Sequence, residues 1–443
     1  MPNRSPRLIG RRIVFAVSLA LASSASWAAD GPLSLAEAQR LAVERSRNLV
    51  AQSLGIDAAR AMADAAGQLP DPVLTLAVDN LPITKEAPAE EPVHPALAKF
   101  ANTNSGNRFS VTRDSMTMRR IGLMQEWTRG EKRELRAERY QAEARKGEAE
   151  VEAARATIRR DTAIAWMDAW HAEAMAAAIA EQRVRGLQEA QLADAQYRAG
   201  RGSQADLLMA RANVAMLDDR AAELERKVKV ARTMLARWAG PEASRPLAAR
   251  PEFATNHLGG HGLDQELAKH PQIQVLARQQ DIASAEARLA QAASKPDITT
   301  EFSYLFRGSQ YGDMVSFEVR IPLPWDTGNR QDREVRARQA IADQAAAQRE
   351  ETLREHVAEV RNMLDEHDSN RGRIARYERE IVPLAAARAE ATLAAYRGAK
   401  ASANDVIAAR RAELEARLQQ LQLEGETARL WAQLNFLALE ETR

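Results

Sequence analysis

The sequence predicts a mainly α-helical protein with a small β part, in which one structural unit occurs twice. Three observations support this: two very long helical stretches, four short segments with strand-like alternation, and a repeat relating the two halves of the chain. The 443 residues include few aromatic side chains and are rich in Ala, Glu, Arg, Leu and Gln, as in proteins built from extended helices.

The repeat is clearest in two short segments. Residues 197–206 and 396–405 align without gaps at an offset of 199, and six of fifteen positions are identical when the alignment is continued to Arg211 and Arg410. Upstream, Pro70-Asp71 aligns with Pro296-Asp297 at an offset of 226, so the first copy holds an insertion of 27 residues between about Pro82 and Asn107. We therefore expect a signal peptide at 1–28, a first repeat at 29–240, a linker at 241–261 and a second repeat at 262–443.

Each repeat has the same order of elements. Helical periodicity covers 33–68 and 262–294, and each stretch ends before a proline. Strand-like segments follow at Pro70–Leu81 and Met116–Trp127, and at Pro296–Phe306 and Met314–Leu323. Long helices are expected at about 129–198 and 329–397, with return helices at 203–238 and 401–440. A helix of about 70 residues spans about 105 Å, so two flanking helices of about 35 residues placed end to end match it. The predicted shape is a long, hollow or bundled rod.

The N-terminus has the features of a secretory signal. Four arginines precede the apolar run Ile13–Ala22, and the small-residue site Ser26-Trp27-Ala28 follows. We expect export by the general secretory route. Removing this leader changes the net charge from +1 to −3, and neither value favours nucleic-acid binding through phosphates.

Other classes are excluded by what the sequence lacks. The absence of Cys excludes disulfides, thiol catalysis, Cys-ligated zinc and lipid attachment to an N-terminal cysteine. No apolar stretch after residue 30 is long enough for a membrane-spanning helix. We find no catalytic or cofactor motif, and we expect neither an enzyme nor a cofactor.

The strand segments alternate apolar and polar residues. In the second copy, Ile298, Phe302 and Phe306 alternate with Glu301 and other polar residues, whereas Met116–Trp127 alternates poorly. This pattern is typical of a barrel strand between lipid and water, but a half-buried sheet in a soluble domain explains it equally well. The export signal and the long helices favour the membrane. Four strands cannot close a barrel, so several chains must contribute, and three would supply twelve strands.

This duplicated order of strands, long helix, tip and return helix resembles the TolC-like outer-membrane efflux channels, over essentially the whole mature chain. The two Tyr-x-x-Gly-x-x-Ser-x-x-Asp-like segments, 197–206 and 396–405, are the more specific signal. The resemblance implies a homotrimer with an outer-membrane β-barrel and a long periplasmic α-helical barrel in a Gram-negative bacterium. It also implies two protein partners, a periplasmic adaptor and an inner-membrane proton-driven pump.

Within that family, three runs look most like the heavy-metal efflux branch. These are Gln68–Pro72, Asp79–Pro82 and Met118–Ile121. Because Cys is absent, the cobalt, zinc and cadmium type matches better than the copper and silver type, without excluding copper. The alternatives are a drug or protein export channel of the same fold and, in another class, a secreted periplasmic coiled-coil scaffold without a pore.

The resemblance implies that the helix tips dock onto the adaptor and constrict the channel entrance. Gly200 and Gly398 are expected at positive φ, and the Ser and Asp residues are also good helix caps, a role that alone would explain them. Asp405 matches an entrance aspartate that would form a ring of negative charge in a trimer, although Ala408 replaces the family's companion acid. The docking candidates are Ala199, Gly200, Arg201, Ser203, Asp206, Gly398, Ala399, Lys400 and Ser402.

Histidines and methionines suggest metal sites, but simpler explanations are favoured. His356 and His367 share a helix face about 16 Å apart, too far to bind one ion, and His257 and His261 lie in the linker without an obvious third ligand. We expect solvated or capping histidines and no metal site. Three methionines suggest a soft copper ladder, but lipid-facing packing is favoured; they are Met116, Met118 and Met124. Three tryptophans are expected to be packing anchors: Trp166, Trp170 and Trp238.

Overall fold

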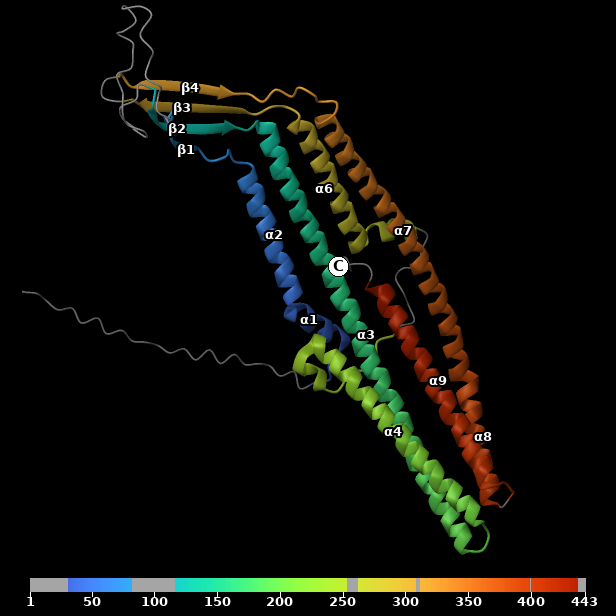
Figure 1. Cartoon of the computed structure of the whole chain (residues 1–443). Helices are drawn as coiled ribbons and strands as arrows, with labels where there is room; N and C mark the ends of the chain where they lie inside the picture. Colours follow the sequence, from blue (N-terminus) through green and yellow to red (C-terminus); the bar gives the residue numbers. More distant parts are fainter. Residues whose placement is uncertain (1–30, 82–115, 253–261, 308–310, 399, 437–443) are drawn as a thin grey trace, which may run out of the picture.

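The computed structural model describes residues 31–81, 116–252, 262–307, 311–398 and 400–436, and the predicted signal peptide and insertion lie outside these ranges. A four-stranded sheet forms one end of a long helical body, and two helix-to-helix turns form the other end (Figure 1). The first half contains α1 (Leu35–Arg45), α2 (Arg47–Ala66), β1 (Val73–Asp79), β2 (Met118–Trp127), α3 (Gly130–Arg198), α4 (Gln204–Ala239) and the 3₁₀ turn η2 (Gly240–Ser244). The second half contains α5 (Leu263–Ala268), α6 (Pro271–Ala293), β3 (Ile298–Phe306), β4 (Met314–Arg320), α7 (Gln331–Arg376), the π turn η3 (Tyr377–Ile381), α8 (Val382–Arg397) and α9 (Ala403–Asn435).

Three of the predicted helices are interrupted. Ser46 ends α1 and caps α2, since its hydroxyl accepts a hydrogen bond from the Leu49 N–H at 3.3 Å. Pro271 starts α6 after a short α5, because proline fits the first turn of a helix but not its interior. The second long helix contains η3 just before Pro383, which has no N–H to donate to the preceding turn.

The Pro-Asp motifs of the repeat lie where the helices meet the sheet. The Asp297 carboxylate accepts hydrogen bonds from the Arg129 N–H at 3.0 Å and from Lys132 Nζ at 2.8 Å. In the other copy, the Gln125 side chain donates to the Pro70 carbonyl at 2.9 Å. These bonds hold the start of α3 and the end of β2 next to the segments that lead into β3 and β1.

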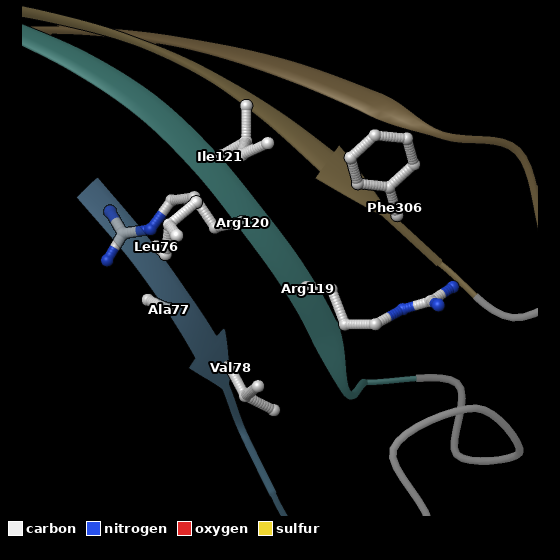
Figure 2. Close-up of a pocket in the computed structure, with 7 residues that line it drawn as sticks. All are labelled: Leu76, Ala77, Val78, Arg119, Arg120, Ile121 and Phe306. Atoms are coloured by element: carbon white, nitrogen blue, oxygen red, sulfur yellow. The ribbon is translucent and has the colours of Figure 1, made fainter. Parts of the chain in front are cut away.

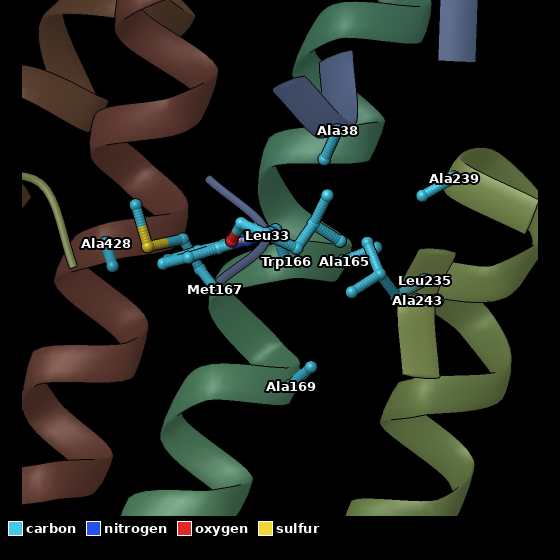
Figure 3. Packing of buried hydrophobic residues seen from close by; sticks show 10 residues of the cluster. All are labelled: Leu33, Ala38, Ala165, Trp166, Met167, Ala169, Leu235, Ala239, Ala243 and Ala428. Atoms are coloured by element: carbon cyan, nitrogen blue, oxygen red, sulfur yellow. Dashed lines mark hydrogen bonds between the residues drawn. The ribbon is translucent and has the colours of Figure 1, made fainter. Parts of the chain in front are cut away.

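The main apolar core lies midway along the helices and is centred on α3 (Figure 3). Trp166 is fully buried, and its indole N–H donates to the Leu33 carbonyl at 3.1 Å. Leu33 also pairs with Leu247, which follows η2, so the end of the first half packs beside its beginning. Trp170 and Trp238 pack against the same cluster, which confirms the prediction that these tryptophans are packing anchors.

In the described part of the chain, no helix combines the length and apolarity that crossing a membrane requires.

Candidate functional site: the sheet and the helix tips

One face of the sheet is apolar and exposed. The antiparallel register places Leu76, Ile121, Tyr304 and Val315 in one row across the four strands, and Leu74, Leu123, Phe302 and Phe317 in the next. Phe317 is 68% exposed, and the other side chains of these rows are exposed as well. Contiguous apolar surface of this kind marks contact with lipid or with another protein.

The opposite face carries charge. The Glu301 carboxylate lies 3.6 Å from Arg120 and 3.6 Å from Arg320, and Glu301 is only 6% exposed. A Cβ atom on Gly122 would come within 2.9 Å of the Glu301 carboxylate, so the missing side chain makes room for this acid. Charged groups on one face and exposed apolar side chains on the other are what a strand between water and lipid requires.

The expectation that the methionines pack on the lipid-facing side of a strand is wrong for Met118 and Met124, while Met116 lies outside β2. Met118 lies opposite Asp79 and Met124 lies opposite Glu301, so both share the face of Arg120 rather than the apolar face. Arg119 and Arg120 are neighbours on the strand and therefore point to opposite faces. The sequence alone thus does not show which arginine shares a face with the methionines. Arg120 pairs with Asp79 at 3.1 Å, and this contact assigns the even-numbered residues of β2 to the charged face.

Aromatic side chains occur near both ends of the exposed apolar face. Trp127 lies at the end nearest the helices, where its indole donates to Thr300 Oγ1 at 2.9 Å. At the far end, Tyr304 packs against Phe306 with ring centroids 4.7 Å apart. A shallow groove of about 360 Å³ runs between β1, β2 and β3 near this far end (Figure 2). Aromatic residues at both borders of an apolar band are typical of membrane strands.

The first tip is the turn between α3 and α4, here called tip 1 (residues 197–206). Gly200 has φ +68°, as expected, and its N–H donates to the Tyr197 carbonyl at 3.0 Å. Ser203 and Asp206 form a capping box, because each side chain accepts a hydrogen bond from the backbone N–H of the other residue.

The second tip is the turn between α8 and α9, here called tip 2 (residues 396–405). Ser402 and Asp405 form the same capping box. The expectation of a positive φ at Gly398 is wrong, since its φ is −84°. Gly398 aligns with Ala199, whose φ is −81°, so it needs no glycine-specific conformation. Ala399, which aligns with Gly200, lies outside the described residues.

Asp405 is an exposed helix cap in the single chain. Its carboxylate accepts hydrogen bonds from the Ser402 hydroxyl at 2.7 Å and from the Ser402 N–H at 2.9 Å. These side-chain and backbone hydrogen bonds lower the pKa of Asp405. The residue is therefore ionised at neutral pH, and capping explains its position whether or not it also acts at an entrance.

A cluster of ion pairs that the sequence did not predict lies just above tip 2. Arg410 on α9 is 5% exposed by side chain and binds three glutamates: Glu189 on α3 at 3.0 Å, Glu390 on α8 at 2.8 Å and Glu413 on α9 at 2.9 Å. Glu413 also binds Arg185 of α3 at 2.9 Å. Burial raises the pKa of Glu189, and the hydrogen bond from Arg410 opposes that shift. The cluster ties α8 and α9 to α3, and the identity of Arg211 and Arg410 in the repeat was the one signal that pointed to this position.

Metal sites with several ligands are not apparent. Among the described residues, no group of three or more His, Asp or Glu side chains lies close enough to hold an ion. The expectation of solvated or capping histidines is wrong for His367, which is fully buried within α7. His257 and His261 are outside the described residues.

The chain is similar to outer-membrane efflux proteins and to outer-membrane channels of known structure. Residues 262–438 match the family model of the outer membrane efflux proteins. Among solved structures, the outer membrane protein VceC from Vibrio cholerae is 18% identical, with a TM-score of 0.69 over 91% of this chain and 95% of that one. The Campylobacter jejuni CmeC outer membrane channel is 14% identical, with a TM-score of 0.72 over 92% of this chain and 87% of that one. The outer-membrane channel OprN is 20% identical, with a TM-score of 0.71 over 91% of this chain and 89% of that one. A search of curated protein sequences gives no match. The chain thus has the mainly helical fold with a small antiparallel sheet that these channels share.

Proposed function

We propose that this chain is one subunit of an outer-membrane efflux channel that passively conducts its substrate from a pump and adaptor to the outside. The observation that carries this proposal is the two-sided sheet, with Phe302 and Phe317 exposed on one face and Glu301 enclosed among arginines on the other. The family match of residues 262–438 and the fold of the whole chain support it.

The sheet supports assembly into a homotrimer. Within the described residues, β1 and β4 each pair with one neighbour and leave one edge open. Open edges are not tolerated in lipid, so a membrane sheet must close. Because β1 and β4 run in opposite directions, β4 of one chain would pair with β1 of the next in the antiparallel sense, and three chains would close a twelve-stranded barrel.

The tips lie at the far end of the helices from the sheet (Figure 1), which is where a partner in the periplasm would bind. We propose that tips 1 and 2 dock onto a periplasmic adaptor, which connects the channel to an inner-membrane proton-driven pump. At about 1.5 Å per residue, the 69 residues of α3 alone reach about 100 Å, long enough to carry the entrance far into the periplasm.

The substrates we propose are heavy-metal cations, on the likeness of Gln68–Pro72 and Met118–Ile121 to the heavy-metal branch. Drug or protein export by the same fold is the alternative. Deleting the gene and exposing the cells to panels of metals and drugs separates the two. Sensitivity to drugs alone, with no rise in cellular metal, would exclude the metal proposal.

The membrane assignment is tested by two charges placed on neighbouring residues of β4. Phe317→Arg puts an arginine on the apolar face, which costs about 2–4 kcal/mol near the middle of a bilayer. Ser316→Arg puts the same charge on the face of Glu301 and Glu318, where it meets acids. We expect the Phe317 variant to be lost from carbonate-washed membranes and the Ser316 variant to be retained. A secreted scaffold without a pore would be released by carbonate in every form of the chain.

The entrance role of Asp405 is tested against Asp206, the matching residue of tip 1. Asp405→Asn and Asp206→Asn each weaken one capping box in the same way. If Asp405 forms a ring at the entrance, Asp405→Asn alone will raise single-channel conductance and reduce block by cations in planar bilayers. Equal conductance and equal cation block in the two variants would mean that Asp405 acts only as a helix cap.

A further inference from the structure

Two histidines from separate helices meet midway along the molecule. His270 immediately precedes α6, and His356 lies in the middle of α7. Their ring centroids are 4.5 Å apart and their planes are inclined by 46°. His270 is 6% exposed. Both histidines are close in the sequence to members of one apolar cluster, which consists of Leu267, Val357, Val360 and Leu434. This pair differs from the His356 and His367 pair considered from the sequence, because it depends on the contact between α6 and α7.

The two nitrogens of the His356 ring have different surroundings. Nδ1 lies 3.7 Å from the carboxylate of Glu359, one turn further along α7. Nε2 is buried and, among the described residues, has no hydrogen-bond partner. A carboxylate on the Nδ1 side favours the tautomer that carries its proton there. That tautomer leaves the lone pair of the buried Nε2 available as a ligand.

The spacing of the two rings is close to that of two imidazoles bound to one ion. A zinc–imidazole bond is about 2.05 Å long, which puts the metal about 3.2 Å from the ring centroid. Two such ligands at the tetrahedral angle around the metal have centroids about 5.2 Å apart. The observed separation is 4.5 Å, so the rings would have to move apart by about 0.7 Å to bind the same tetrahedral ion.

We propose that His270 and His356 form a two-histidine site for a divalent cation of the zinc, nickel and copper class. Imidazole nitrogen suits these ions, whereas Mg²⁺ and Ca²⁺ require oxygen ligands. Water fills the remaining coordination positions, and Glu359 orients His356 from outside. A bound ion would connect the N-terminus of α6 to α7. The site is independent of the proposed channel function, since it concerns binding by the chain and not conduction.

The test uses the purified full chain in detergent, without an affinity tag and stripped of metal. Zn²⁺ titrated by calorimetry is expected to bind once per chain and to raise the thermal midpoint, while Mg²⁺ leaves the midpoint unchanged. His270→Gln and His356→Gln should each weaken Zn²⁺ binding at least tenfold. The matched control is His257→Gln combined with His261→Gln, which removes the linker histidines and should keep full affinity.

A spectroscopic measurement avoids dependence on the folding of the variants. Cu²⁺ bound to the unmodified chain should give an electron paramagnetic resonance spectrum with coupling to two imidazole nitrogens. Glu359→Gln should weaken Zn²⁺ binding less than either histidine variant, because Glu359 acts through His356. Absence of saturable Zn²⁺ binding, or binding lost only in the linker control, would overturn the proposal.

Discussion

The two tips carry the same motif in different surroundings. Next to tip 1, on α4, Arg211 is exposed and lies 3.5 Å from Asp194 of α3. Next to tip 2, on α9, the side chain of the matching Arg410 is 5% exposed, against 62% for Arg211, and it binds glutamates on three helices. The six shared positions are Tyr197 and Tyr396, Arg198 and Arg397, Ser203 and Ser402, Asp206 and Asp405, Ala210 and Ala409, and Arg211 and Arg410.

The matching tyrosines also differ in exposure, and again the residue of the second copy is the buried one. Tyr197 is exposed at tip 1, whereas Tyr396 is buried in a cluster with Leu393, Ala403 and Val406. Leu192 of α3 packs against that cluster, so tip 2 rests on the first long helix. The duplicated residues therefore preserve the turn and its caps, while contact with the neighbouring helix determines whether a side chain is buried.

The largest difference between the tips is expected from removing their arginines. Arg410→Gln leaves Glu189 and Glu413 without Arg410 in a poorly solvated place and should destabilise the helical tip by about 3 kcal/mol. Arg211→Gln removes an exposed pair and should cost less than about 1 kcal/mol. Thermal unfolding in detergent measures both, and hydrogen exchange should show faster opening of α8 and α9 in the first variant alone.

The Arg410→Gln deficit should depend on pH. Burial already raises the pKa of Glu189, and losing Arg410 raises it further. A carboxyl whose folded pKa lies above its unfolded pKa destabilises the fold when ionised, so stability falls as the pH rises through that window. The variant should therefore recover part of its loss between pH 7 and pH 5. A deficit that stays constant over this range would mean that Glu189 is solvated in the variant.

The turn glycines should respond with opposite signs. Gly200→Ala forces a Cβ into the left-handed region at φ +68° and should cost about 1 kcal/mol. Gly398→Ala keeps an ordinary φ of −84°, and the new Cβ would lie 3.6 Å from two carbonyl oxygens, which is normal contact. This second change should stabilise tip 2 by about 0.5 kcal/mol, because alanine restricts the unfolded chain. Thermal midpoints of the two variants decide the comparison, and a loss at both positions would show that tip 2 also needs a glycine.

The features that the sequence predicted well are local. Helix caps depend on residues three apart, and both capping boxes can be recognised from Ser203 with Asp206 and from Ser402 with Asp405. Strand alternation likewise identified the apolar faces of β3 and β4 before their register was known.

The features that could not be predicted from the sequence depend on contacts between segments far apart in the chain. Arg410 meets Glu189 across 221 positions of the chain, and no periodicity connects them. His270 meets His356 only because α6 packs against α7. The faces of β2 were misjudged for a related reason, since two consecutive arginines leave the choice of face to their partners, and Asp79 and Glu301 decide it.

The smallest expected difference between the two tips concerns the hydroxyl group of Tyr396. Among the described residues, the buried Tyr396 hydroxyl has no hydrogen-bond partner, and burial raises its pKa, with the charge of Asp206 acting in the same direction. Tyr396→Phe removes an unsatisfied polar group from a packed site and should leave stability unchanged or raise it by up to about 1 kcal/mol. Tyr197→Phe, at the exposed tyrosine of tip 1, should change nothing measurable. A clear loss in the Tyr396 variant, measured by thermal unfolding, would instead mean that the hydroxyl bonds to Asp206 through water. In that case the two tips would be coupled to each other through residues of their shared motif.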